Sequence, residues 1–209
     1  MHNFFQRIRK LKANSFTLVE LLVVISIIGL LAGLATPAIQ KGLEKGKQTT
    51  DVSNGRQVAM ILFAYANDES LGAGTFPTNG ATSTDIFNAL VTNGFVTTHK
   101  VLGGNGVPSP KTAGTNPVAS ESVYWAYTKG LAITDGGIPL LSTKNSIKLN
   151  NINSSAAVTP DMSSPWKDKG FVIVTADCAS TWYSFTNGKV SGRWATLDAS
   201  ATNVSLLQP

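Results

Sequence analysis

The chain has 209 residues, of which 43% are hydrophobic and 14% are charged, and it contains one cysteine, Cys178. This composition indicates a folded protein with one domain plus appendages, and the single cysteine excludes an intramolecular disulfide. The net charge of +5 does not indicate nucleic-acid binding: four basic residues gather in the first 15 positions, and without them 13 of the 17 basic residues remain against 12 acidic ones.

The first 15 residues form a short basic segment. Its charge comes from Arg7, Arg9, Lys10 and Lys12, with no acidic residue beside them. Basic residues that precede an apolar segment act as a positive-inside signal and keep the N-terminus in the cytoplasm. We therefore expect residues 1–15 to be a basic leader peptide.

Residues 16–39 form an apolar segment that is long enough to cross a membrane. The run reads FTLVELLVVISIIGLLAGLATPAI and contains one charged side chain, Glu20. A helix of about 24 residues is roughly 36 Å long, and a bilayer core needs about 20 residues. The segment therefore predicts a transmembrane helix.

Three interpretations of this segment compete. A secretory signal peptide fits the basic start and the small residues near position 35, but its apolar run is usually only about 7–15 residues long. A plain signal anchor has no use for Glu20, because an ionisable side chain inside a membrane span is costly. The third interpretation is cleavage between Ser15 and Phe16, which creates an α-amine about one helical turn before Glu20. An ammonium and a carboxylate at the same depth stabilise each other in an apolar medium, within one helix or between neighbouring helices.

The segment KANSFTLVELLVVISIIGLLAGLATPAI, residues 12–39, resembles the N-terminus of type IV pilins and of the pseudopilins of type II secretion. The resemblance rests on the basic leader, Phe16 at the start of the mature chain, Glu20 as its fifth residue, the apolar span, and Pro37 near the end of that span. One departure is Ser15, where the family normally has glycine.

This resemblance implies a structural subunit and not an enzyme. A membrane-bound prepilin peptidase would cut after Ser15 and N-methylate Phe16. The mature subunit would wait in the inner membrane as a single-pass protein with a periplasmic head. An inner-membrane assembly platform would then add it to a filament of its own copies and of other pilins or pseudopilins. Phe16 and Glu20 would set the register of assembly, and Pro37 would kink the helix.

After the span, the pattern predicts that the helix continues to about Leu71. An apolar face at the spacing i, i+3, i+4, i+7 indicates packing against the head. This face consists of Val58, Ile61, Leu62 and Tyr65. Residues 41–55 contain three glycines and few apolar side chains, which predicts an exposed or mobile stretch. We expect residues 40–75 to be the amphipathic continuation of the helix.

Residues 76–209 are expected to form an α+β head on the periplasmic or extracellular side. A short helix is predicted after a cap at Ser83 or Thr84, with a stop at Gly94. Its apolar face consists of Ile86, Phe87, Leu90 and Val91. Strands are predicted at residues 122–128, 138–142, 147–152, 170–175, 181–185 and 193–197, of which the fourth and fifth form a hairpin. The whole chain thus reads as a long N-terminal hydrophobic helix that runs into a head with a short helix and an antiparallel sheet, similar to a pilin.

The head offers few residues for chemistry, and we expect no catalytic residue. His99 is the one histidine outside the leader, and with no nucleophile or carboxylate beside it a surface position is expected. Cys178 is expected to behave as a small buried hydrophobic residue. The Asp135-Gly136-Gly137 run predicts a turn, with a calcium-loop fragment as the alternative because some pseudopilins hold calcium. No other metal or cofactor is expected.

Several aromatic residues lie in the predicted strands or close to them. They are Tyr124, Trp125, Tyr127, Trp166, Trp182, Tyr183 and Trp194. A platform for a carbohydrate or nucleic acid is one interpretation, but without basic residues around them a role in the core is favoured. The alternative to a filament subunit is a secreted or membrane-anchored binding module whose hydrophobic segment is only a signal or anchor.

Overall fold

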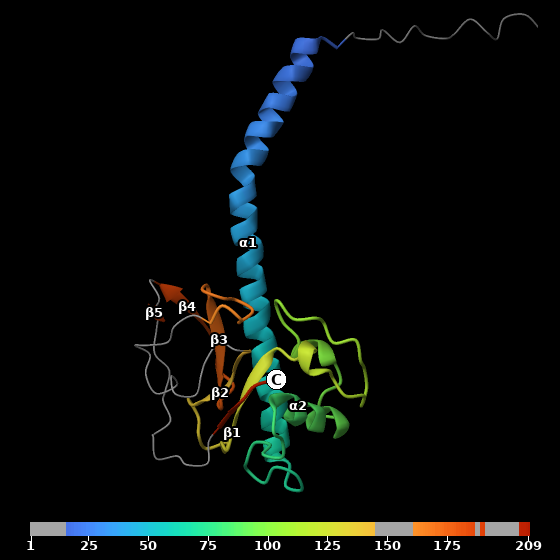
Figure 1. The fold of residues 1–209 in the computed structure, drawn as a ribbon, viewed down its shortest axis with the longest axis vertical. Coiled ribbons are helices and arrows are strands. Elements are labelled where there is room, and N and C mark those ends of the chain that lie inside the picture. The colour runs from blue at the N-terminus through green and yellow to red at the C-terminus, as the bar shows by residue number, and fades with distance from the viewer. Residues whose placement is uncertain (1–15, 145–160, 187–188, 191–204) are drawn as a thin grey trace, which may run out of the picture. The chain divides into compact units, whose positions relative to one another are not determined.

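The computed structural model describes residues 16–144, 161–186, 189–190 and 205–209. The elements within these ranges are the helices α1 (Leu18–Asn67) and α2 (Ser83–Thr92), the 3-10 turns η1 (His99–Leu102) and η2 (Ser120–Ser122), and the strands β1 (Trp125–Lys129), β2 (Pro139–Thr143), β3 (Gly170–Thr175), β4 (Ser180–Thr186), β5 (Lys189–Val190) and β6 (Ser205–Leu207). The chain divides into an N-terminal part, Met1–Lys45, and a C-terminal part, Gly46–Pro209. The predicted α+β class, with a long N-terminal apolar helix, is confirmed (Figure 1).

The described portion of the N-terminal part is helical from Leu18 onward. Every residue from position 16 to position 43 is exposed, so the apolar side chains of the segment have no cover within the described chain. The helix continues through Pro37 without a break. It also continues through residues 41–55, where we expected a mobile or exposed stretch; that expectation is wrong at the end of the stretch, because Asp51 and Gly55 are buried.

In the C-terminal part, the last four turns of α1 pack on the sheet. The buried face of the helix contains Gly55, Val58, Ala59, Leu62 and Ala66. Ile61 and Tyr65 lie at its margin and are partly buried against the same core, which confirms the predicted face. A Cβ atom at Gly55 would lie 2.7 Å from the Trp125 ring and 2.8 Å from a methyl of Val174. Glycine therefore allows α1 to lie close to β1 and β3.

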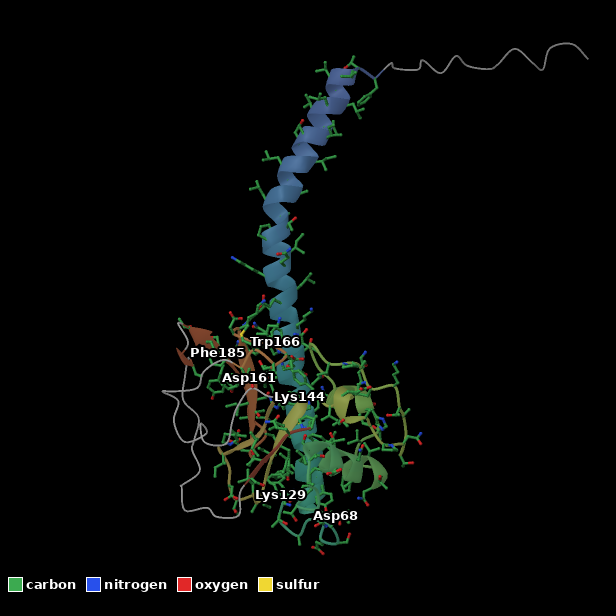
Figure 2. The ribbon with its side chains drawn as sticks, viewed as in Figure 1. Asp68, Lys129, Lys144, Asp161, Trp166 and Phe185 are labelled. Atoms are coloured by element: carbon green, nitrogen blue, oxygen red, sulfur yellow. The ribbon has the colours of Figure 1, made fainter. Side chains whose placement is uncertain are left out.

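Helix α1 ends at Asn67, four residues earlier than expected. The next residue, Asp68, accepts a hydrogen bond from the Ser70 amide (2.9 Å), and its carbonyl accepts one from the Gly72 amide (2.9 Å). Gly74 has φ of +88° and donates its amide to Ala66 (2.8 Å). An aspartate that bonds its own backbone competes with the helix ladder, so the chain turns at Asp68, which Figure 2 labels.

Helix α2 forms where the sequence predicted it, and all four apolar residues of its predicted face are buried. The predicted cap is wrong by one residue. Thr82 is the N-cap: its hydroxyl accepts from the Asp85 amide (3.2 Å), and Asp85 accepts from the Thr82 amide (2.9 Å). Ser83 instead donates its hydroxyl to the carbonyl of Trp125 (2.8 Å) and so joins α2 to β1. Gly94 follows the helix with φ of +77°, as expected of a stop.

The strands form an antiparallel sheet in the order β5-β4-β3-β2-β1-β6. The predicted hairpin is β3–β4, in which Phe171 lies opposite Tyr183. Alternate residues of β3 face different clusters. Val172 and Val174 join the core that holds α1, and Phe171 and Ile173 lie in a smaller apolar cluster. Strands β5 and β6 were not predicted, and the strands predicted at residues 147–152 and 193–197 lie outside the described residues.

Candidate assembly site

Two polar side chains bond to one another at the start of α1: Thr17 directly before the helix and Glu20 in its first turn. The Thr17 amide and hydroxyl both donate to Glu20 Oε2, each at 2.8 Å. The Glu20 amide donates back to the Thr17 hydroxyl oxygen at 3.2 Å. This reciprocal arrangement is a capping box, which satisfies two amides that no helical carbonyl can reach. Glu20 therefore has a role within its own helix.

The sequence analysis did not assign a role to Thr17. The signal was present in the sequence, because threonine followed three residues later by glutamate and then by an apolar run marks a helix start. The predicted partner of Glu20, a free amine on Phe16, does not exist in the uncut chain. Phe16 lies before the helix and is 69% exposed. Ser15 lies outside the described residues, so its role in cleavage remains a prediction.

The hydroxyl groups within the apolar segment are satisfied inside the helix. Ser26 donates to the Leu22 carbonyl and Thr36 donates to the Ala32 carbonyl, each at 2.7 Å. In lipid a polar group must find its partner within the protein, and these contacts meet that condition. By length and composition α1 can cross a membrane, and its apolar stretch is not buried within the described residues.

Pro37 removes one backbone hydrogen bond from the apolar segment. Proline has no amide hydrogen, so the carbonyl four residues earlier, that of Gly33, lacks its helical donor. A Cβ atom at Gly33 would meet nothing within 4 Å, and the same holds for Gly29. The helix therefore lacks one backbone hydrogen bond in the turn that ends at Pro37. The kink assigned to Pro37 remains a prediction.

In the C-terminal part, a buried carboxylate joins α1 to the head, and the sequence analysis missed it. Asp51 is only 2% exposed. It accepts hydrogen bonds from the Tyr124 hydroxyl (2.5 Å), the Trp166 indole (2.8 Å) and the Asn105 amide (3.3 Å). The Trp166 indole also lies 2.7 Å from the Tyr124 oxygen, and Figure 2 shows Trp166 beside α1. One side chain of the helix thus binds three separate segments.

Burial raises the pKa of Asp51, although the three hydrogen bonds and Lys47 oppose the shift. Burial and the charge of Asp51 also raise the pKa of Tyr124 far above its usual range, so this hydroxyl stays a donor. Helical spacing in the sequence could have placed Asp51 on the buried face of the helix. Asp51 lies four residues before Gly55 and seven before Val58, on the face that packs against the head.

His99 does not lie on the surface, so that prediction is wrong. Its side chain is 3% exposed. Nδ1 lies 2.9 Å from the Thr112 hydroxyl, and Nε2 lies 2.8 Å from the Gly114 carbonyl. The imidazole therefore holds in place the loop between η1 and η2, which carries Thr112 and Gly114. The sequence could not reveal this, because both partners are more than ten residues away.

Two aspartates of the head bond within turns. Asp135 accepts the Ala132 amide (2.8 Å), and Asp177 accepts from the Thr175 hydroxyl. Cys178 is half-buried at φ of +62° against the core, and burial raises the pKa of its thiol. Among the described residues, no three His, Cys, Asp or Glu side chains gather to hold a metal ion.

Most of the aromatic residues lie in the core, as favoured by the sequence. Those that are buried are Tyr124, Trp125, Tyr127 and Trp166. Trp182 is partly buried and packs edge-on against Trp166, with ring centroids 5.0 Å apart. Trp194 lies outside the described residues.

Comparison with known proteins adds one match. The family described as the prokaryotic N-terminal methylation motif matches residues 10–36. This is the prepilin signal motif of type IV pilins and pseudopilins, so the predicted resemblance is confirmed over those residues. No curated protein and no solved structure matches the chain. The motif and the apolar helix together fit anchoring in a membrane.

Proposed function

We propose that the chain is the precursor of a structural subunit of a type IV pilus-like filament or of a type II secretion pseudopilus. The observation that carries this proposal is a prepilin methylation motif that overlaps an apolar segment, residues 16–39, in which every residue is exposed. Prepilin peptidase removes residues 1–15 and methylates Phe16. The subunit stays in the inner membrane with its head in the periplasm until the assembly platform adds it to copies of itself or to other pilins and pseudopilins.

Glu20 has two successive roles in this proposal. In the uncut chain its carboxylate closes the capping box with Thr17. Cleavage places an ammonium at Phe16, directly before the cap. The start of a helix already carries a partial positive charge, so an ammonium there is unfavourable unless an acidic group offsets it. Glu20 supplies that group, within its own chain or to the amine of a neighbouring subunit.

The first test is the N-terminus of the natural protein, determined by mass spectrometry of the mature chain. N-methylphenylalanine at position 16 is the expected result. A chain that retains residues 1–15 would refute processing. A chain that starts at Thr36 would instead indicate a signal peptide.

The second test separates the two roles of Glu20 by comparing Glu20→Gln with Glu20→Ala. Glutamine also closes a capping box, because its side-chain oxygen can accept the Thr17 amide, but it carries no charge. If charge pairing sets the register, both variants insert normally into the membrane and both lose filaments. Filament yields at the wild-type level in Glu20→Gln, with a loss only in Glu20→Ala, would limit Glu20 to capping.

A further inference from the structure

The part of α1 that directly follows the apolar segment has a basic side and an apolar side. Lys41 and Lys45 are four residues apart and both are exposed, so they adjoin one another on the helix surface. Ile39 and Leu43 are 59% and 64% exposed. They lie on the opposite side, because two residues of a helix correspond to a rotation of about 200°. The two sides exist only because α1 stays helical through these positions.

All four residues belong to the N-terminal part of the chain, together with the apolar segment. The length of that segment sets their depth in a bilayer. An ionisable side chain such as Glu20 is least costly at the border of the hydrocarbon core. With Glu20 at one border, residues 21–39 supply 19 residues, or about 28 Å of helix, which matches a core of about 30 Å. Lys41 then lies about 3 Å beyond the other border, and Lys45 about 9 Å beyond it.

Both lysine side chains lean back toward the bilayer. In an α-helix every Cα–Cβ bond tilts toward the N-terminus, which for Lys41 and Lys45 is the direction of the apolar segment. The headgroup layer on each side of a bilayer is about 5–8 Å thick. A lysine near the end of a span bends its long stem to keep the ammonium in this layer. The two ammonium groups therefore reach the depth at which lipid phosphates lie.

The local charge favours an anionic lipid. Glu44 is the one acidic residue from position 40 to position 46, so this stretch carries two positive charges and one negative charge, a net charge of +1. A single phosphodiester balances that charge if its headgroup has no cation of its own. A zwitterionic lipid such as phosphatidylcholine brings a cation with its phosphate and leaves the charge unbalanced.

Membrane orientation does not explain the two lysines. The four basic residues within positions 1–15 already supply the positive-inside signal. Basic residues just beyond the other end of the span act against that signal, because the cytoplasmic side retains them. Contact with lipid phosphates gives these lysines a reason to lie where they do.

We infer that Lys41 and Lys45 together bind the phosphate of an anionic phospholipid, while Ile39 and Leu43 contact the acyl chains of neighbouring lipids. This inference rests on the membrane anchoring in the proposed function and adds a class of lipid to it. It also has a consequence for assembly, because a subunit that leaves the bilayer must release this lipid.

Native mass spectrometry of the full-length chain tests the site directly. The chain in micelles of an uncharged detergent is titrated with phosphatidylglycerol or with phosphatidylcholine of the same acyl chains, and the wild type should bind phosphatidylglycerol more tightly. Each lysine close to an anionic lipid surface strengthens the attraction about fivefold, so Lys41→Gln with Lys45→Gln should weaken phosphatidylglycerol binding about 25-fold. Binding of phosphatidylcholine should not change. Glycerol phosphate, which has no acyl chains, should not displace the lipid.

Two further variants serve as controls. Lys100→Gln with Lys111→Gln removes the same charge from two exposed lysines of the C-terminal part and should bind both lipids as the wild type does. Glu44→Gln removes the acidic residue beside the pair and should strengthen the binding of phosphatidylglycerol. The thermal midpoint in the same micelles checks folding, and both double lysine variants should keep the wild-type midpoint because their side chains are exposed.

Equal affinity of the wild type for the two lipids would overturn the inference, and so would an unchanged preference in the variant of Lys41 and Lys45. That unchanged preference together with a loss of filaments would assign the lysines to a contact between subunits. The proposed function is tested separately in cells. Normal methylation of Phe16 and normal filaments beside equal lipid affinities would refute only the lipid site, whereas retention of residues 1–15 in the natural protein would refute only the filament subunit.

Discussion

Replacing Gly55 by alanine should destabilise the C-terminal part, although alanine is the better helix former. Alanine is favoured over glycine inside a helix by about 1 kcal/mol. At this position, however, the new methyl group would lie 2.7 Å from Trp125 Cη2 and 2.8 Å from Val174 Cγ2. Carbon atoms pack best at about 3.5–4.0 Å, so one side of the contact must move by roughly 1 Å.

Neither neighbour can move easily. Trp125 and Val174 are both completely buried, each in a strand paired on both sides. The Trp125 indole is also held by its hydrogen bond to the Val101 carbonyl (3.1 Å). Overpacking of a core typically costs about 1–3 kcal/mol, and this rigid site belongs at the upper end. After subtracting the helix gain, we expect a net loss of about 2 kcal/mol.

The assay is denaturation of the full-length chain in detergent micelles, followed by tryptophan fluorescence. All four tryptophans lie in the C-terminal part, so the signal reports on that part. A loss of about 2 kcal/mol corresponds to a fall in Tm of about 4–8 °C for a domain of this size. Gly46→Ala is the control, because its Cβ meets nothing within 4 Å; it should leave Tm unchanged or raise it. Equal or higher stability of Gly55→Ala would refute the close-packing argument.

Three further predictions concern residues of the head. Burial raises the pKa of Asp51 in the folded state, so the folded protein binds the proton more tightly than the unfolded chain does. The free energy of unfolding of the wild type, relative to that of Asp51→Asn, should therefore fall as the pH rises from the usual aspartate range to the raised pKa. Guanidinium titration at several pH values measures this difference, and a difference that does not change with pH would contradict the burial argument. Thr82→Ala removes the N-cap of α2 and should cost about 1 kcal/mol in the same titration; no loss would show that Asp85 alone suffices. His99→Ala leaves the Thr112 hydroxyl and the Gly114 carbonyl without their partner, so it should lower the free energy of unfolding by about 1–3 kcal/mol. It should also speed proteolysis of the loop that carries these two residues. An unchanged rate of cleavage would show that other contacts hold the loop.

Much of the chain could be predicted from local patterns. Helix spacing placed Val58 and Leu62 on the buried face of α1, and the apolar spacing of α2 identified all four of its core positions. Alternation and turn residues located β3 and β4 with an error of one residue at each end at most. These signals are local, because a helix face and a strand each depend on residues that are close in sequence.

Local patterns failed where the partner is distant. The sequence predicted a surface position for His99, yet the residue is buried and bonds to Thr112 and Gly114. Gly55 read as part of an exposed stretch, yet Trp125 packs against it.

The sequence by itself determined that this protein carries a basic N-terminal segment, an apolar segment with one glutamate, and a prepilin-type motif, because charge, length and hydrophobicity are properties of consecutive residues. Only the tertiary structure decided that Asp51 is the buried link between α1 and the head. A carboxylate can be buried only if donors from elsewhere replace its water, and those donors are 54, 73 and 115 residues away in the chain.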